Sequence, residues 1–389
     1  MDLTFSDAVS SFVGGIGLTG LTVSHVIMMI LSILLIYLAI AKRFEPLLLL
    51  PLAFGMLVAN MPGANLSAYD EGFLFYYLYM GIKLVLYPPL IFLCIGSMTD
   101  FGPLISNPKS AFIGLGGQLG LFTALFASVA VSRLLAPIFD SIHEFSWGEA
   151  ASIGIIGSAD GPTSIFTATM LAPDLLPIIA IAAFSYMALV PMIQPPIMRL
   201  LTNAKERVIV MPPPKQVTKR QKVFFPIIVT IVTMLFVPTA GALVGMLMLG
   251  NLIRESGVAE RYVRTLNNEL LNVLTLLVAV SIGSSARADY FLMPQTLLII
   301  VLGLFAFVSG TFGGVLIAKL LCHLTGGKVN PLIGNSGVSA MPMAARISQK
   351  LGQKYNPHNH LLMHAMGPIV ASTMGSALIA GIFIALFGG

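Results

Sequence analysis

The chain has 389 residues, of which 57% are hydrophobic and only 10% are charged. Soluble domains carry roughly 25% charged residues, so this composition excludes a water-soluble globular protein. The net charge of +5 could suggest a nucleic-acid partner, but the basic residues lie in short connections between apolar runs. They form no patch interleaved with aromatic residues, and we therefore expect topology signals rather than nucleic-acid binding.

Apolar runs fill nearly the whole chain, each about 17 to 25 residues long and able to cross a hydrocarbon core of about 30 Å. This predicts an all-α polytopic transmembrane bundle, with residues 1–389 as a single membrane domain. We expect no removable signal peptide, because no Lys or Arg precedes Lys42. The expected spans are 21–41, 46–60, 73–97, 111–136, 152–171, 176–200, 224–250, 268–284, 291–322, 330–350 and 361–388.

The longest polar connection, residues 203–222, divides the chain into two halves. It holds six basic residues around three consecutive prolines, which predicts a cytoplasmic, semi-stiff loop. The first half contains a predicted repeat unit, 111–200, with a Gly/Ser/Pro-interrupted helix at 157–163. The second contains another, 291–389, with a broken segment at 330–346. Interrupted hydrophobic segments at corresponding places indicate a transporter-type binding site and an inverted repeat, here by pattern and not by aligned residues.

The first break surrounds Asp160, a carboxylate within an otherwise apolar stretch. Such a group costs about 2.5–3.5 kcal/mol on insertion scales, so something must offset its charge. Gly161 and Pro162 should break the helix there and leave carbonyls free beside the carboxylate. Ser158, Asp160 and Thr163 then supply the oxygen ligands that a hard cation such as sodium requires. The alternative is a Gly-Pro kink with its carboxylate satisfied by a neighbouring group.

The second break is rich in amides and hydroxyls, namely Asn330, Asn335, Ser336 and Ser339. Irregular backbone at membrane depth is tolerated only where it lines a cavity or is buried in protein, so we expect it to face the first break. Arg346 follows two helical turns after Ser339 and, if buried, would suit an anionic carboxylate. It could equally mark a cytoplasmic helix end together with Lys350 and Lys354.

Four further features have both a functional and a structural interpretation. Tyr186 lies in an apolar run ahead of three prolines and could relay a proton, coordinate an ion or simply occupy the core. Arg287 and Asp289 are expected to form a local ion pair rather than a transport site. The two cysteines are expected to be inert, and the histidines near residue 360 lack a metal-binding pattern.

Six strings of residues are long and unusual: FEPLLLLP (44–51), PPLIFLCIGSMTDFGP (88–103), GSADGPT (157–163), SYMALVPMIQPP (185–196), NPLIGNSGVSAMPMAAR (330–346) and HAMGP (364–368). In these strings the chain resembles the beta subunits of sodium-pumping, biotin-dependent decarboxylases. That family acts on oxaloacetate, methylmalonyl-CoA, glutaconyl-CoA or malonate. The likeness extends over almost the whole chain.

The resemblance implies a membrane enzyme that works within a complex. A partner alpha subunit would transfer a carboxyl group to biotin, and this chain would decarboxylate the carboxybiotin while exporting Na+. A small gamma subunit would tie the complex together, self-association is plausible, and the expected location is the bacterial inner membrane. Biotin would not be attached to this chain.

The resemblance and the local chemistry together assign site residues. Tyr186, Ser339 and Arg346 are the expected catalytic residues, and Arg346 also the carboxybiotin-binding residue. The expected sodium ligands are Asp160, Ser158, Thr163, Asn330, Gly334, Asn335 and Ser339, of which Ser158, Thr163 and Asn335 come from the local chemistry alone. One departure is Ile369, where such beta subunits typically have Asn. Either one sodium site is weakened or absent, or Ser372 or Thr373 substitutes.

Two other functions compete with a decarboxylase pump. The same broken segments could serve a stand-alone sodium-coupled transporter or Na+/H+ antiporter, which would work without a biotinylated partner. A membrane scaffold could instead dock a soluble enzyme through the basic loop. Neutralising Asp160 would leave such a scaffold unharmed.

Overall fold

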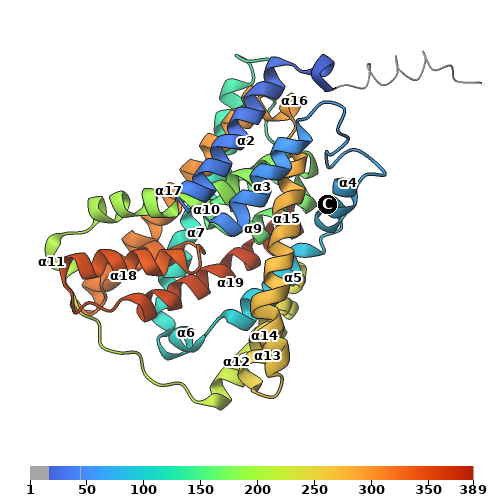
Figure 1. Ribbon diagram of the computed structural model, residues 1–389. Coiled ribbons are helices and arrows are strands. Elements are labelled where there is room, and N and C mark those ends of the chain that lie inside the picture. Colours follow the sequence, from blue (N-terminus) through green and yellow to red (C-terminus); the bar gives the residue numbers. More distant parts are fainter. Residues whose placement is uncertain (1–16, 44, 389) are drawn as a thin grey trace, which may run out of the picture.

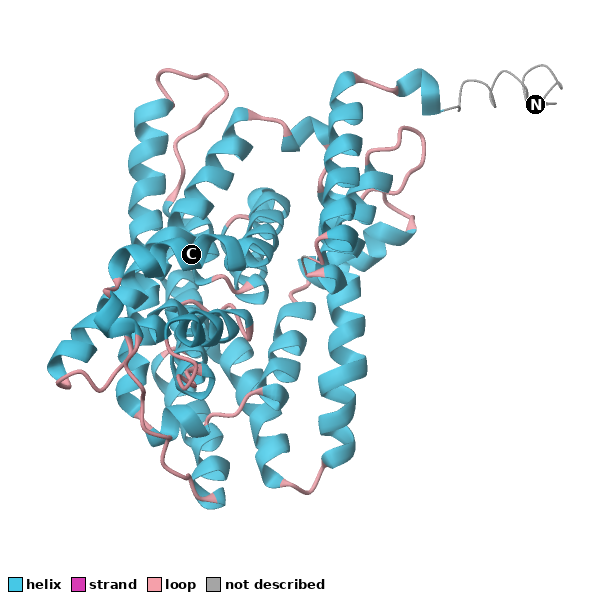
Figure 2. Cartoon of the chain, turned by 60° about the vertical axis from the view of Figure 1, so that its left-hand side comes forward, coloured by secondary structure: helices cyan, strands magenta, loops and turns pink. Residues whose placement is uncertain are grey.

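The computed structural model describes residues 17–43 and 45–388, and the expectation about a signal peptide concerns residues that lie largely outside this part. Every element in the described residues is helical, which confirms the predicted all-α class (Figures 1 and 2). The α-helices are α2 (Val23–Ala41), α3 (Pro46–Ala59), α4 (Leu74–Lys83), α5 (Tyr87–Met98), α6 (Gly102–Ser106), α7 (Ala111–Leu135), α8 (Trp147–Gly154), α9 (Gly161–Leu171), α10 (Leu176–Leu201), α11 (Ala204–Arg207), α12 (Lys219–Phe236), α13 (Gly241–Ser256), α14 (Glu260–Thr265), α15 (Leu271–Ser285), α16 (Ala288–Phe291), α17 (Pro294–Leu324), α18 (Met343–Tyr355) and α19 (Leu362–Phe387). Short 3-10 turns are η1 (Gly17–Gly20), η2 (Pro108–Ser110), η3 (Ile155–Ser158), η4 (Pro173–Leu175), η5 (Pro238–Ala240) and η7 (Pro331–Gly337), and η6 (Leu266–Leu270) is a π-helical turn.

The chain is a membrane protein by the length and surface of its helices. Five helical stretches are long and apolar enough to span a membrane, and two bent pairs raise the total to as many as seven among the described residues. Large apolar side chains such as Leu235 and Phe236 on α12 are 74% and 81% exposed, which is unfavourable in water and favourable in lipid. The spanning stretches are Val23–Ala41, Pro108–Leu135, Glu260–Ser285, Pro294–Leu324 and Leu362–Phe387.

Both bent pairs have a proline at or near the bend. In α10, the segments Pro173–Met187 and Leu189–Leu201 meet at 63°. The ring of Pro191 displaces the carbonyl four residues earlier, that of Met187, so the helix bends there. The pair α4 and α5 meets at 68°, with Pro88 and Pro89 in the first turn of α5.

Three predicted crossings are wrong, because the chain turns back instead of crossing. Residues 152–171 form parts of α8 and α9, and Gly148 at the start of α8 lies against the Leu171 carbonyl at the end of α9. Residues 330–350 form η7 and part of α18, with Ser348 Oγ donating to the Leu332 carbonyl at 3.2 Å. Residues 224–250 fall on α12 and α13, separated at Pro238. Hydropathy cannot distinguish two short antiparallel helices from one long one.

The two ends of the molecule differ in charge. Lys319 near the end of α17 lies 3.6 Å from Glu206, which places the basic segment at this end, here called the basic end. The 31-residue helix α17 begins at the opposite, distal end. There Gln295 contacts His143 at 3.2 Å, and Arg287 and Asp289 form the expected local ion pair at 3.1 Å.

The two helical hairpins approach the middle from opposite ends. The α8–α9 hairpin has its open side at the distal end, because Thr169 of α9 and Gln295 of α17 line one cavity there. The η7–α18 hairpin has its open side at the basic end, because Asn330 Nδ2 donates to the Arg207 carbonyl at 3.2 Å. Their tips therefore meet inside the protein, between α7, α17 and α19 (Figure 1).

At the basic end, an ion pair ties the α12–α13 hairpin to the α5–α6 corner. Lys222 Nζ lies 2.8 Å from Asp100 Oδ1 and 4.0 Å from Glu255 Oε2. Partial burial opposes ionisation of Asp100, but the Lys222 hydrogen bond and charge prevail and lower the pKa of its carboxyl below 3.8.

We expect the Asp100–Lys222 pair to add stability at neutral pH and to lose this effect in acid. Because the folded pKa is the lower one, the contribution is present above pH 3.8 and disappears as the pH falls through the folded value. In detergent at pH 7, thermal unfolding should show that the free energy of unfolding of Asp100→Asn is lower than that of wild type. The difference should be less than about 1 kcal/mol, because the pair is partly exposed. A difference that persists undiminished at pH 2.5 would contradict this assignment.

Candidate functional site

Local sequence places Asp160 between two helix ends. Ser146 caps the start of α8. Its side-chain hydroxyl accepts a hydrogen bond from the backbone amide of Glu149, and the Glu149 carboxylate accepts one from the backbone amide of Ser146. The chain then breaks at Ala159, whose φ of +52° is unfavourable for a residue with a Cβ. Asp160 is extended, and Gly161 and Pro162 start α9. The carboxylate therefore lies at the positive end of the α9 dipole.

The Asp160 carboxylate is buried and has only neutral partners. Thr163 Oγ1 donates to Oδ2 at 2.6 Å, and Ser376 Oγ of α19 lies 3.1 Å from the same oxygen. The residue is 5% exposed. Across the described ranges 17–43 and 45–388, no Lys, Arg or His forms a salt bridge with it. A buried ionised carboxylate needs a compensating charge, so the site favours either a proton or a bound cation.

The tips of the two hairpins are hydrogen-bonded to each other. The Ser339 amide donates to the Ser158 carbonyl at 2.7 Å, which joins the first break to the second. Ser158 Oγ itself donates to the Ile155 carbonyl at 2.8 Å, so this hydroxyl already has a partner. The structure thus brings Ser158, Asp160, Thr163 and Ser339 together at the middle of the protein.

A second group of oxygens lies one helical turn away along α19. Ser339 Oγ and Ser372 Oγ are 3.0 Å apart, and Ser372 Oγ lies 2.6 Å from the Gly337 carbonyl. The side-chain amide of Gln118 on α7 donates to the Ser372 carbonyl and hydroxyl at 3.2 and 3.0 Å. Its own oxygen, Oε1, is buried and has no hydrogen-bond partner in the part of the chain that the structure describes. Flipping the amide would set two carbonyl oxygens against each other, so this orientation is favoured.

Ile369 lies on α19 with Ser372 and Thr373, the two residues that could supply the oxygen ligand missing at position 369. Ile369 is fully buried, and Thr373 Oγ1 donates to its carbonyl at 3.0 Å. The Thr373 hydroxyl is therefore directed along its own helix, whereas the Ser372 hydroxyl faces Ser339. Of the two, Ser372 is the one positioned beside the hairpin tips.

Glycines make the close approach of the second tip possible. A Cβ on Gly117 of α7 would lie 1.7 Å from the Gly337 carbonyl oxygen. A Cβ on Gly314 of α17 would lie 2.3 Å from the carbonyl oxygen of Gly334, one of the predicted sodium ligands. Real Cβ atoms do not come so near, so η7 reaches its depth only because α7 and α17 carry glycine there.

Asn335 and Asn330 are engaged in packing the second hairpin. Asn335 Nδ2 donates to Gln194 Oε1 and to the Ala344 carbonyl, and its oxygen accepts from Ser348. Asn330 lies at the basic end, where its Nδ2 donates to the Arg207 and Ile209 carbonyls. Its oxygen accepts from the Leu332 amide. Their roles as sodium ligands stay predictions.

Tyr186 and Arg346 lie apart from the hairpin tips. Tyr186 is buried and lies two residues before the bend of α10. Its hydroxyl donates a hydrogen bond to the Ile300 carbonyl of α17. Arg346 is exposed on α18, so the possibility that it is buried was wrong. Burial raises the pKa of Glu45, and the positive charge of Arg346 offsets part of this rise, which places Arg346 near the start of α3.

The sequence reasoning missed Gln118 and Ser376. Gln118 is the only amide side chain within α7, and this could have drawn attention to it. Ser376 is one of several small polar residues in α19, and nothing in the sequence sets it apart. Both reach the site across long sequence separations, which local patterns do not reveal.

Comparison with known proteins gives consistent matches along almost the whole chain. Residues 24–387 match the family described as "Na+-transporting oxaloacetate decarboxylase beta subunit". The chain is 49% identical to the methylmalonyl-CoA decarboxylase subunit beta of Propionigenium modestum, covering 98% of this chain and 99% of the relative. It is 49% identical to the glutaconyl-CoA decarboxylase subunit beta of Acidaminococcus fermentans, covering 99% of both. It is 44% identical to the probable oxaloacetate decarboxylase beta chain of Vibrio cholerae, covering 92% of this chain and 94% of the relative.

Replacing Gly117 by alanine should disrupt the contact between α7 and the second hairpin. The new methyl group would overlap the backbone at Gly337, so we expect a loss of about 1–3 kcal/mol of stability or more. Gly241→Ala is the matched control, because its nearest neighbours there are Met234 side-chain atoms at 3.6 Å and beyond. Thermal unfolding should separate the two variants. Equal unfolding temperatures would show that the approach at Gly117 is looser than the structure indicates.

Proposed function

The chain belongs to the family of Na+-transporting decarboxylase beta subunits, and we propose that it is the membrane subunit of a decarboxylase sodium pump. In this proposal it removes CO2 from carboxybiotin and couples that step to Na+ export. The carboxybiotin is delivered by a biotin-carrying alpha subunit, and a small gamma subunit holds the complex together. The complex lies in the bacterial inner membrane, with the basic segment 203–222 in the cytoplasm.

The observation that carries this proposal is the buried Asp160 carboxylate at the meeting point of two oppositely directed hairpins. The hydroxyl oxygens of Thr163 and Ser376 contact it, and oxygen atoms are the ligands that sodium prefers. Two hairpins from opposite ends also fit an inverted repeat, with residues 111–200 and 291–389 as the two units. Such an arrangement supports access to the ion from one side at a time.

We assign sodium binding to Asp160, Thr163, Ser158 and Ser339, with Ser372 in place of the oxygen that Ile369 lacks. We assign Arg346 to the carboxylate of carboxybiotin, since its guanidinium is exposed and a carrier domain could reach it. Tyr186 is assigned to the proton path, because its hydroxyl lies inside the protein beside the bend of α10. Coupling then requires that loss of CO2 at one place changes ion access at another.

In this proposal the alpha subunit, and not this membrane chain, selects the acid that the complex decarboxylates. Relatives named for methylmalonyl-CoA, glutaconyl-CoA and oxaloacetate decarboxylation have similar identities to this chain, between 44% and 49%. Three substrates served by such similar membrane subunits support selection of the acid by the alpha subunit. A stand-alone Na+-coupled transporter is the alternative, and it predicts sodium transport by the purified chain without any biotinylated partner.

The sodium site can be tested by thermal unfolding of the purified chain. Sodium should raise the unfolding temperature and potassium should not, because a ligand of the native state stabilises it; at 100 times Kd the gain is about 2.7 kcal/mol. In Asp160→Asn the sodium effect should vanish, while the sodium-free protein stays at least as stable, since a buried charge is removed. Equal stabilisation of both proteins by sodium would contradict the assignment of Asp160.

The carboxybiotin role of Arg346 predicts a separable defect. In the reconstituted complex, Arg346→Gln should lower decarboxylation at least tenfold, about 1.4 kcal/mol of transition-state stabilisation. It should leave the sodium-dependent rise in unfolding temperature unchanged. Lys350→Gln, an exposed cation one turn further along α18, is the matched control and should retain activity. Similar losses in both variants would indicate a general charge effect and not a specific contact.

A further inference from the structure

A cavity of about 840 Å³ opens at the distal end of the molecule, away from the basic segment. Its wall is mixed, with aromatic, charged and neutral polar groups that include Tyr79, Lys83, His143, Asp174 and Gln295. Carboxylate, amide and imidazole groups can hydrogen-bond to water, and the volume is large enough for a hydrated ion. None of these groups belongs to the site around Asp160.

Helix α9 connects this cavity with Asp160. Thr169, near the end of α9, lines the cavity, whereas Asp160 directly precedes the first residue of the helix. Nine residues separate them, which corresponds to about 13 Å at 1.5 Å per residue. An ion that travels between the carboxylate and the cavity must pass along this interval.

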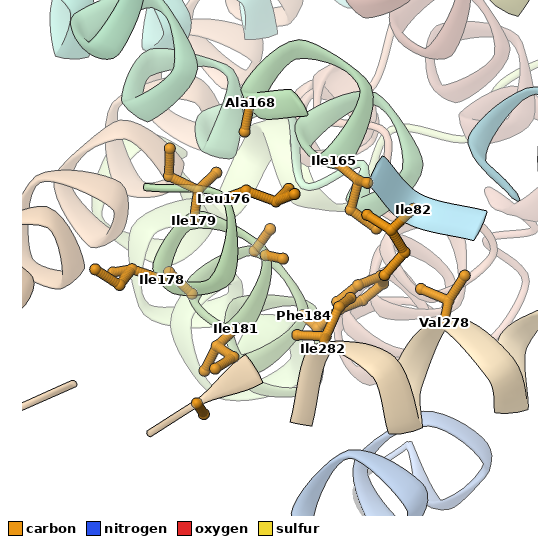
Figure 3. Packing of buried hydrophobic residues seen from close by; sticks show 14 of the residues in the cluster. Ile82, Ile165, Ala168, Leu176, Ile178, Ile179, Ile181, Phe184, Val278 and Ile282 are labelled. Atoms are coloured by element: carbon orange, nitrogen blue, oxygen red, sulfur yellow. The ribbon is translucent and has the colours of Figure 1, made fainter. Parts of the chain in front are cut away.

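Apolar side chains fill the interval. We call Ile165, Leu176, Ile179, Phe184 and Ile282 the apolar seal; each is at most 3% exposed, and all belong to one hydrophobic cluster (Figure 3). They come from α9, α10 and α15. Leu176 also lines the cavity, so the outer surface of the seal forms part of the cavity wall.

Phe184 is the member of the seal that packs against Gly161, the residue that follows Asp160. A Cβ on Gly161 would lie 2.3 Å from Phe184 Cε1, so the ring rests directly on the residue that follows Asp160. Only glycine leaves room for the ring at that position. Because a charged ion is strongly disfavoured in a dry apolar constriction, this packing closes the route from the cavity.

We propose that the distal cavity is the outer aqueous vestibule for a hydrated monovalent cation, and that the apolar seal, with Phe184 packed against Gly161, closes it from Asp160. The identity of the cation as sodium rests on the proposed function. Leu176, Ile179 and Phe184 all lie on the α10 segment before the 63° bend. A movement of that segment against α9 would open the seal as a unit.

Cysteine accessibility tests the seal without reference to pumping. In a background with Cys94 and Cys322 replaced by Ala, the complex in lipid nanodiscs is treated with a charged, membrane-impermeant maleimide. The Thr169→Cys variant should be labelled rapidly, and the Ile165→Cys variant should react at least tenfold more slowly. Adding Phe184→Ala should raise labelling of Ile165→Cys at least tenfold, whereas Phe184→Leu, which keeps apolar bulk and a stable fold, should not.

Three results would overturn the proposal. They are slow labelling of Thr169→Cys, rapid labelling of Ile165→Cys with Phe184 intact, and protection of Ile165→Cys that persists in correctly folded Phe184→Ala protein.

A passive 22Na+ flux through Phe184→Ala proteoliposomes, measured without substrate, should exceed that of wild type and of Phe305→Ala, an exposed aromatic control on α17. The expected labelling with no rise in flux would contradict the assignment to sodium. The expected labelling in a wild-type complex that pumps no sodium would instead contradict the proposed function.

Discussion

The burial of the Asp160 carboxylate without an ion-pair partner among the described residues is the constraint on which the rest of the structure depends. Its carboxylate is 5% exposed, and hydroxyls are its only side-chain partners among the residues described. A salt bridge would satisfy it permanently and leave no role for a mobile ion. In the proposed function, the hydroxyls satisfy the carboxylate only in part, so that a cation is attracted to it on arrival and can also leave. This balance between binding and release is what an ion pump requires.

The fold is organised to deliver oxygen ligands to this point. Two hairpins turn back within the protein, and the bond from the Ser339 amide to the Ser158 carbonyl joins their tips. Glycines at 117 and 314 let the second hairpin approach within backbone contact of α7 and α17. The α19 helix then adds the hydroxyls of Ser372 and Ser376 along one face, one turn apart. The oxygens of the site therefore come from three separate parts of the chain, the two hairpins and α19, and each contributes few atoms.

Hydropathy predicted the long helices well, because an apolar run of sufficient length is stable in lipid as a helix. The predicted spans that correspond closely to α7, α10, α17 and α19 are 111–136, 176–200, 291–322 and 361–388. It failed at 152–171, 330–350 and 224–250, where the chain turns back. Hydropathy reports how apolar a segment is, but not whether the chain continues through the membrane or reverses. The importance of Asp160 could be predicted from its cost in an apolar stretch. Ser376 could not, because its contact spans 216 positions in the sequence and depends on how α19 packs.

Equilibrium binding of 22Na+ to the purified chain, with excess potassium present, tests the central claim most directly. The account predicts saturable binding that is lost in Asp160→Asn and weakened in Ser376→Ala, whose hydroxyl lies 3.1 Å from the carboxylate. Saturable binding of equal affinity in wild type and Asp160→Asn would contradict it. In that case the buried carboxylate would carry a proton, and sodium would bind elsewhere in the protein.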